Sequence, residues 1–253
     1  MTASAEQIHQ SLEAVARLRQ LRATNPPLAA AATAVKRFQA QRFEATYPDL
    51  LTNPRYCPAA GFFLYEIYSD KDYAERDQQF ARIANSIAKL FPQSVVHTAA
   101  AMADVHALTE QLDDAMARAY LALPKGVGGH PGQINAAQYV TCWRQVCEPP
   151  DRQRQLDLVL ALGQSLDSLT RKPGLRTLLK LMRGPAMAAG LSSLQRFLEA
   201  GFDAFQTMRG ADEFLKLIAE REGSWITRLF EDDAEQCATT LTALTTSGRK
   251  SSS

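Results

Sequence analysis

Apolar residues recur at every third or fourth position along most of the chain, which is the spacing of one face of an α-helix. Residues 5–23 illustrate the pattern, with Ile8, Leu12 and Val15 on one side and Arg or Gln on the other. No stretch of useful length alternates apolar and polar residues as a strand would. Proline and glycine divide the pattern into segments, since the residue before a proline is disfavoured in a helix. The sequence therefore predicts an all-α fold of about ten or eleven helices, at residues 5–23, 28–47, 58–68, 72–91, 92–123, 133–148, 150–171, 173–182, 184–208, 212–222 and 225–244.

The predicted helices are expected to form a single compact domain over residues 1–246. At 253 residues the chain is long enough to bury a substantial core. The alternative is a loose division at the glycine-rich loop of residues 125–132, because glycine leaves the backbone least constrained. Residues 247–253 are polar and are predicted to be a disordered tail.

Composition and charge narrow the class of protein. The apolar fraction of 46% and the charged fraction of 22% are ordinary for a globular protein. The formal net charge of +1 argues against a dedicated nucleic-acid binder, which usually carries a clear basic excess. The four cysteines form no CxxC pair and no zinc-ligand spacing, so they are predicted to be reduced thiols, mostly buried, in a cytosolic protein. No signal peptide and no apolar run of membrane-spanning length is present, which predicts a soluble cytoplasmic protein with no membrane partner.

Several charged residues fall on the apolar faces of predicted helices. Arg76 lies at the centre of the apolar stripe of residues 72–91, and Asp77 lies at its edge. Arg42 shares the apolar face of residues 28–47, and Glu66 points between two phenylalanines of the next helix. Since buried charge is costly unless it is paired, these four residues are predicted to meet in one network. Two interpretations remain open: a structural network that fixes helix register, or a pocket that binds an anion or another ligand.

Histidines of residues 92–123 offer further candidate chemistry. His97 and Asp104 lie two helical turns apart on the border of the core face, and they are assigned to the same polar cluster. His106, Glu110 and Asp113 share a neighbouring side, a spacing that could hold a metal ion. The repeated Glu-x-x-His signature of di-iron helix bundles is missing. A hydrogen-bonded or solvated histidine is therefore favoured, and no metal site is predicted.

A basic stripe follows one side of the helix predicted at residues 173–182. It consists of Lys172, Arg176, Lys180 and Arg183. Such a stripe could dock an acidic protein partner or a phosphate-bearing molecule. The alternative is a solvated helix face without a partner.

Two stretches of this chain resemble a family of uncharacterised, predicted-helical bacterial proteins. The first reads RFxxTYxDLL, then RYxPAAxFFLYEIY, then AERD, and the second is LQRFLEAGFDAFQTMRGADEFLKLIAERE. The matching residues of the first stretch are Arg42, Phe43, Tyr47, Asp49, Arg55, Tyr56, Pro58, Phe62, Phe63, Glu66, Tyr68, Arg76 and Asp77. The resemblance implies a helical fold and attaches no activity, cofactor or partner to the chain.

Two functions from different classes follow from these observations. The first is a non-enzymatic protein-interaction or regulatory role, in which the basic stripe meets a partner. The second is a small-molecule or cofactor-binding protein, including an enzyme of the heme-oxygenase-like kind, with a pocket lined by the inward-facing Arg, Glu and His residues. That comparison is an analogy of fold alone, and it identifies no cofactor. A cavity among the inward charges, or their closure on one another, separates the two.

Overall fold

The computed structural model describes residues 2–67, 70–124 and 132–250, and every regular element in these ranges is a helix. The all-α prediction is therefore confirmed. The described part contains thirteen α-helices and one π-helical turn: α1 Ala3–Ala23, α2 Pro26–Thr46, α3 Pro48–Thr52, α4 Cys57–Phe62, η1 Phe63–Ile67, α5 Ala74–Leu90, α6 Gln93–Ala122, α7 Ala136–Val146, α8 Pro149–Thr170, α9 Leu175–Leu181, α10 Arg183–Ala188, α11 Ser192–Met208, α12 Asp212–Glu231 and α13 Ala234–Lys250. None of the described helices is apolar over a length that would let it cross a membrane.

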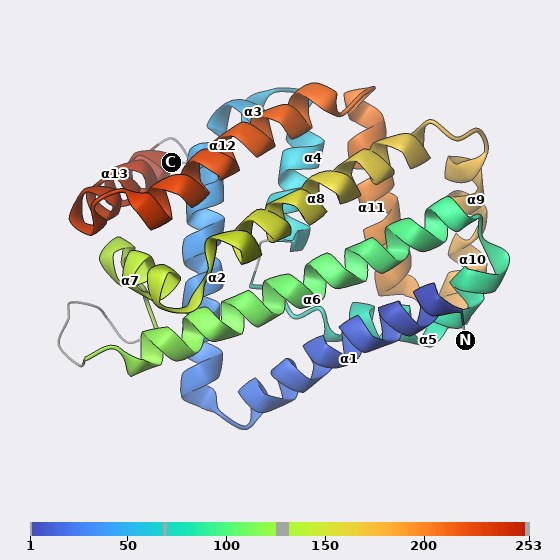
Figure 1. The fold of residues 1–253 in the computed structure, drawn as a ribbon. Coiled ribbons are helices and arrows are strands. Elements are labelled where there is room, and N and C mark those ends of the chain that lie inside the picture. Colours follow the sequence, from blue (N-terminus) through green and yellow to red (C-terminus); the bar gives the residue numbers. More distant parts are fainter. Residues whose placement is uncertain (1, 68–69, 125–131, 251–253) are drawn as a thin grey trace.

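The helices form two crossed layers with α6 at the centre. Helices α1, α6, α8 and α12 lie side by side in one layer, each in contact with the next, as Figure 1 shows. Helices α2, α4 and α11 cross behind this layer, and α7 and α13 pack together at the end nearest α2. Since α6 contacts α1, α2, α5, α7 and α8, most of its surface is turned to protein rather than to solvent.

Aromatic side chains fill the space between the layers. Phe63 of η1, Phe205 of α11 and Phe214 of α12 pack together and are almost fully buried. Each such ring contributes about 1.5–3 kcal/mol through the burial of its apolar surface. At the crossing of α8 and α12, a Cβ on Gly163 would lie 2.5 Å from a methyl group of Leu215, so a larger residue there would force the Leu215 side chain to move.

One predicted helix, over residues 184–208, is divided in the structure. Helix α10 ends at Ala188 and α11 begins at Ser192, with Gly190 between them at φ +67°. This left-handed conformation suits glycine and interrupts the helical phase. Met187 lies on the short helix α10 and is 72% exposed.

The C-terminal helices also differ from the prediction. Helix α12 continues through Gly223, so Trp225 lies inside it rather than at the start of a new helix. The break comes at Asp233, whose side chain accepts hydrogen bonds from the backbone N–H groups of Glu235 and Gln236. Helix α13 extends to Lys250, beyond the predicted end near residue 244. Residues 125–131 and 251–253 lie outside the described residues, so the loose division at the glycine loop stays a prediction.

Candidate functional site

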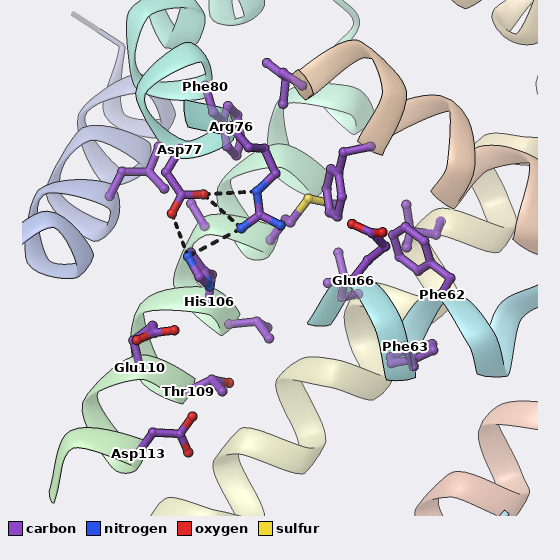
Figure 2. Close-up of a pocket in the computed structure, with 18 of the residues that line it drawn as sticks. Phe62, Phe63, Glu66, Arg76, Asp77, Phe80, His106, Thr109, Glu110 and Asp113 are labelled. Carbon is purple, nitrogen blue, oxygen red and sulfur yellow. Dashed lines mark hydrogen bonds and ion pairs between the residues drawn. The ribbon is translucent and has the colours of Figure 1, made fainter. Parts of the chain in front are cut away.

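Arg76 and Asp77 face the interior from the first turns of α5. The Arg76 Nε and Nη2 atoms donate to Asp77 Oδ1 over 3.0 and 2.8 Å, and Asp77 is 4% exposed. Figure 2 shows this pair beside His106 of α6, whose Nε2 lies 2.9 Å from Asp77 Oδ2. Arg19 of α1 donates to the same oxygen over 2.8 Å. Asp77 thus joins three helices, and the structure places only this half of the predicted network together.

The charges around Asp77 keep it ionised. Burial by itself opposes ionisation of the carboxyl, but the hydrogen bond and charge of His106, with the charge of Arg76, outweigh it and hold the pKa of Asp77 well below its usual range. Arg76 is held further by the rings of Tyr73 and Phe197, whose centroids lie 4.2 and 4.6 Å from its Cζ atom.

Arg42 belongs to a different ion pair from the predicted one. Its Nη1 and Nη2 atoms donate to the two carboxylate oxygens of Glu222 in α12 over 3.0 and 2.7 Å. The hydroxyl of Tyr47 donates to the same carboxylate over 2.9 Å. Burial disfavours the guanidinium charge, but the adjacent Glu222 outweighs it and raises the pKa of Arg42. Helical periodicity correctly predicted that Arg42 faces the interior, but it gives no information about a partner so distant in sequence.

Glu66 does not join either pair. It lies in the π-helical turn η1, where hydrogen bonds span one more residue than in an α-helix and shift the directions of the side chains. Its side chain is 32% exposed and accepts a hydrogen bond from Lys71 over 3.1 Å. In Figure 2 Glu66 lies apart from Arg76 and Asp77, at the edge of the cavity. The predicted four-residue network is therefore wrong in Arg42 and Glu66.

His97 and Asp104 also lie outside the cluster. His97 is exposed to solvent. Asp104 faces α1, where the Ser11 hydroxyl donates to it over 2.5 Å and the Gln7 side-chain amide donates as well. Asp104 therefore fastens α1 to α6. In the described residues no group of three or more potential ligands is arranged for a metal ion.

A cavity of about 50 Å³ lies beside the Asp77 cluster. Phe62, Phe63, Phe80 and Phe197 form much of its apolar wall, and Asp113 of α6 is among its polar residues. A water molecule needs a cavity of at least about 10–15 Å³, so this one has room for a few water molecules. Sites for drug-sized ligands are about 300–1,000 Å³. As the side chains stand, this cavity is too small for a porphyrin, which removes the main support for the heme-oxygenase-like analogy.

Glu110 and Asp113 of α6 both face the interior but differ in their partners. Glu110 accepts hydrogen bonds from Lys36 and Arg22, which outweigh the effect of burial and lower the pKa of Glu110 to about 2. Asp113 is 2% exposed and accepts one hydrogen bond, from Gln39 Nε2 over 3.0 Å. Burial raises the pKa of Asp113.

Most buried charged residues in the described part of the chain have an opposite charge within 4.0 Å. Five of the seven do: Arg42, Asp77, Glu110, Asp114 and Asp167. Asp113 and Arg152 do not, although both are buried. Arg152 is not among the residues predicted from the sequence. Its burial could have been predicted, because Arg152, Leu156 and Val159 follow one another at helical spacing on the buried face of α8.

Gln155 links Arg152 of α8 to Thr109 of α6. Arg152 Nη1 donates to Gln155 Oε1 over 2.9 Å, and Gln155 Nε2 donates to the Thr109 hydroxyl over 3.0 Å. Arg152 and Gln155 also line a second cavity of about 50 Å³. Gln39 and Phe63 line both cavities, so the two are neighbours.

Replacing Asp113 by Asn tests whether the pKa of this carboxyl is raised in the folded protein. Its pKa is raised in the folded state, so the folded protein binds this proton more tightly than the unfolded chain does, and the resulting contribution to stability is lost as pH rises through the folded pKa. We expect the urea midpoint of the parent protein to fall relative to that of Asp113→Asn between pH 4 and pH 8. Equal pH profiles for the two proteins would show that Asp113 titrates as an ordinary solvated carboxyl.

The predicted basic stripe is partly occupied by carboxylates of α11. Arg176 donates to Asp203 over 2.6 Å, and Arg183 Nε donates to Glu199 over 2.7 Å. Lys172 donates to the Ser94 hydroxyl over 2.5 Å, and Lys180 is exposed. The four residues do not form one free stripe, because two of them are used to attach α9 and α10 to α11.

The segment that carries this stripe is nevertheless strongly basic. Residues 168–198 contain six Lys or Arg residues and no Asp or Glu. Helix α9 has no buried residue, and α10 buries only Ala186. Leu178, Leu181 and Met187 are 39%, 70% and 72% exposed, and they are half of the large apolar side chains exposed in the described residues.

The comparisons with known proteins define a family without assigning an activity. Residues 18–236 match the model of a family described as Domain of unknown function (DUF8198). The chain belongs to this family, which agrees with its resemblance to uncharacterised proteins. Neither the comparison with curated proteins nor that with solved structures finds a match.

Proposed function

We propose that this protein acts without catalysis, by docking on a partner protein through the α9–α10 surface. We define that surface as Leu178, Lys180, Leu181, Arg183 and Met187. The main support is that these two short helices present three exposed apolar side chains among basic residues. They belong to residues 168–198, which contain no Asp or Glu. Contiguous exposed apolar side chains often mark interaction sites in proteins.

The partner that fits this surface is a protein with an apolar groove and an acidic rim. Full burial of a Leu or Met side chain contributes about 1.5–3 kcal/mol, so Leu181 and Met187 together could supply a large part of a micromolar affinity. The basic residues would select an acidic surface and increase the rate of encounter. Because Arg176 and Arg183 already bind carboxylates of α11, the exposed Lys180 is the best placed to contact an acidic group of the partner.

We place this role in the bacterial cytoplasm. The four cysteines support this setting, because all are free and three are buried, as expected where thiols stay reduced. The family resemblance supports the bacterial source.

Site-specific photo-crosslinking tests the docking role. A photoreactive amino acid at position 181 or 187, introduced in cells that produce the protein, should give a protein adduct of defined mass. The matched control is position 21, since Leu21 of α1 is 51% exposed but lies away from the basic segment. The adduct should weaken with Lys180→Glu and persist with Lys216→Glu, whose lysine on α12 has a side chain that is 76% exposed.

Three results would contradict the proposal. Equal adducts from positions 21, 181 and 187 would show that contact is non-specific. Adducts with lipid would point to a membrane surface, and adducts with a second copy of the chain would point to self-association.

A further inference from the structure

Arg152 is a buried cation with neutral partners. It lies in the second turn of α8, is 3% exposed, and has no carboxylate oxygen within 4.0 Å among the described residues. Its Nε and Nη2 atoms donate to Cys147 Sγ over 3.3 and 3.0 Å, and Nη1 donates to Gln155. The ring of Trp143 covers one face of the guanidinium, with its centroid 3.9 Å from Cζ. A buried charge is costly unless it is paired, so this arrangement favours an anion beside Arg152.

Several residues that line the second cavity carry N–H groups without an acceptor. Arginine has five N–H donors. Three of those on Arg152 bind Cys147 and Gln155, which leaves one on each Nη atom. Arg42 Nε and Trp143 Nε1 are buried and have no hydrogen-bond partner. Arg42, Trp143 and Arg152 all line the second cavity, so several donors without an acceptor belong to its wall.

No acidic group forms an ion pair with Arg152 in the described residues, although Asp113 interacts with it electrostatically over more than 4.0 Å. Burial raises the pKa of Cys147 despite the adjacent guanidinium, so the thiol stays protonated. Burial also raises the pKa of Tyr139 to about 12, so its hydroxyl stays neutral. Asp113 lies beyond 4.0 Å, and Glu222 is already bound by Arg42 and Tyr47.

We infer that the second cavity is a binding site for one small carboxylate anion, held by the free N–H groups of Arg152. Arg42 Nε and Trp143 Nε1 are its further donors. The cavity of about 50 Å³ suits an anion of a few atoms, such as formate, and is too small for a larger acid without side-chain movement. Water could satisfy the donors but could not balance the charge. This inference is independent of the α9–α10 surface.

Fluorescence of Trp143 offers a direct test in the full chain. The protein has two tryptophans, so Trp225→Phe leaves Trp143 as the reporter. Sodium formate is titrated at constant ionic strength against a bulky sulfonate salt. We expect a saturable change in fluorescence. In the same background, Arg152→Met should weaken binding at least about 10-fold, because it removes a charge-assisted bidentate contact.

The matched control is Arg118→Met, which removes an arginine of α6 whose side chain is 53% exposed and should leave the titration unchanged. Should Arg152→Met not fold, Arg152→Lys keeps the charge without the planar fork, and about 10-fold weaker binding is expected. A linear response to formate, or an Arg152 variant that titrates like its parent, would overturn the inference. Saturation by chloride but not by formate would overturn the assignment to a carboxylate.

Discussion

Replacing Glu222 by Ala is expected to lower the free energy of unfolding by about 3–5 kcal/mol. The change leaves the guanidinium of Arg42 buried without its bidentate partner, and an uncompensated buried charge is strongly destabilising. Tyr47 loses the acceptor of its hydroxyl as well. Urea denaturation at pH 7 measures the effect.

Two further variants serve as controls for the loss at Glu222. Glu66→Ala should change the free energy of unfolding by less than about 1 kcal/mol, because its exposed pair with Lys71 resembles ordinary surface ion pairs. The double variant Arg42→Met with Glu222→Met should recover much of the loss, since apolar side chains can replace a buried pair. A Glu222→Ala protein as stable as its parent would show that water reaches Arg42.

The second large effect is expected for Asp77→Asn, at about 3 kcal/mol or more. The substitution removes the charge that holds Arg76, Arg19 and His106 while it keeps the shape of the side chain. The matched control is Asp49→Asn, which removes a surface partner of Arg221 and should cost about 1 kcal/mol or less.

The loss at Asp77 should depend on pH. The folded-state pKa of Asp77 lies below its unfolded value of about 3.9, so its stabilisation is complete above about pH 5 and is lost as pH falls. The difference between Asp77→Asn and its parent should therefore shrink from pH 5 to pH 3. Glu110, with a folded pKa of about 2, should preserve an acid-dependent loss in both proteins. A constant difference across this range would mean that the stabilisation does not come from the negative charge of Asp77.

Part of the candidate site could be predicted from local sequence. Arg76 and Asp77 are neighbours in the chain, and one helical wheel places both toward the core. The same helical periodicity predicted that Arg42 faces the interior, and it would have predicted the same for Arg152. The prediction failed for Glu66, because a π-helical turn changes the angle between successive side chains. It also failed for His97, because apolar periodicity does not show whether a neighbouring helix covers that side of α6.

The sequence by itself determined that this protein is helical throughout its described part and which face of most helices is buried. Both properties follow from interactions within a few residues, and a period of 3.6 records them directly. Tertiary structure alone decided which buried charges meet, because Arg42 and Glu222 lie 180 positions apart. It also decided that α12 continues through Gly223 while the chain breaks at Gly190, since glycine permits both conformations and packing selects one. Finally, it left Arg152 and Asp113 without opposite charges beside two small cavities, an arrangement that arises only where α2, α6 and α8 pack together.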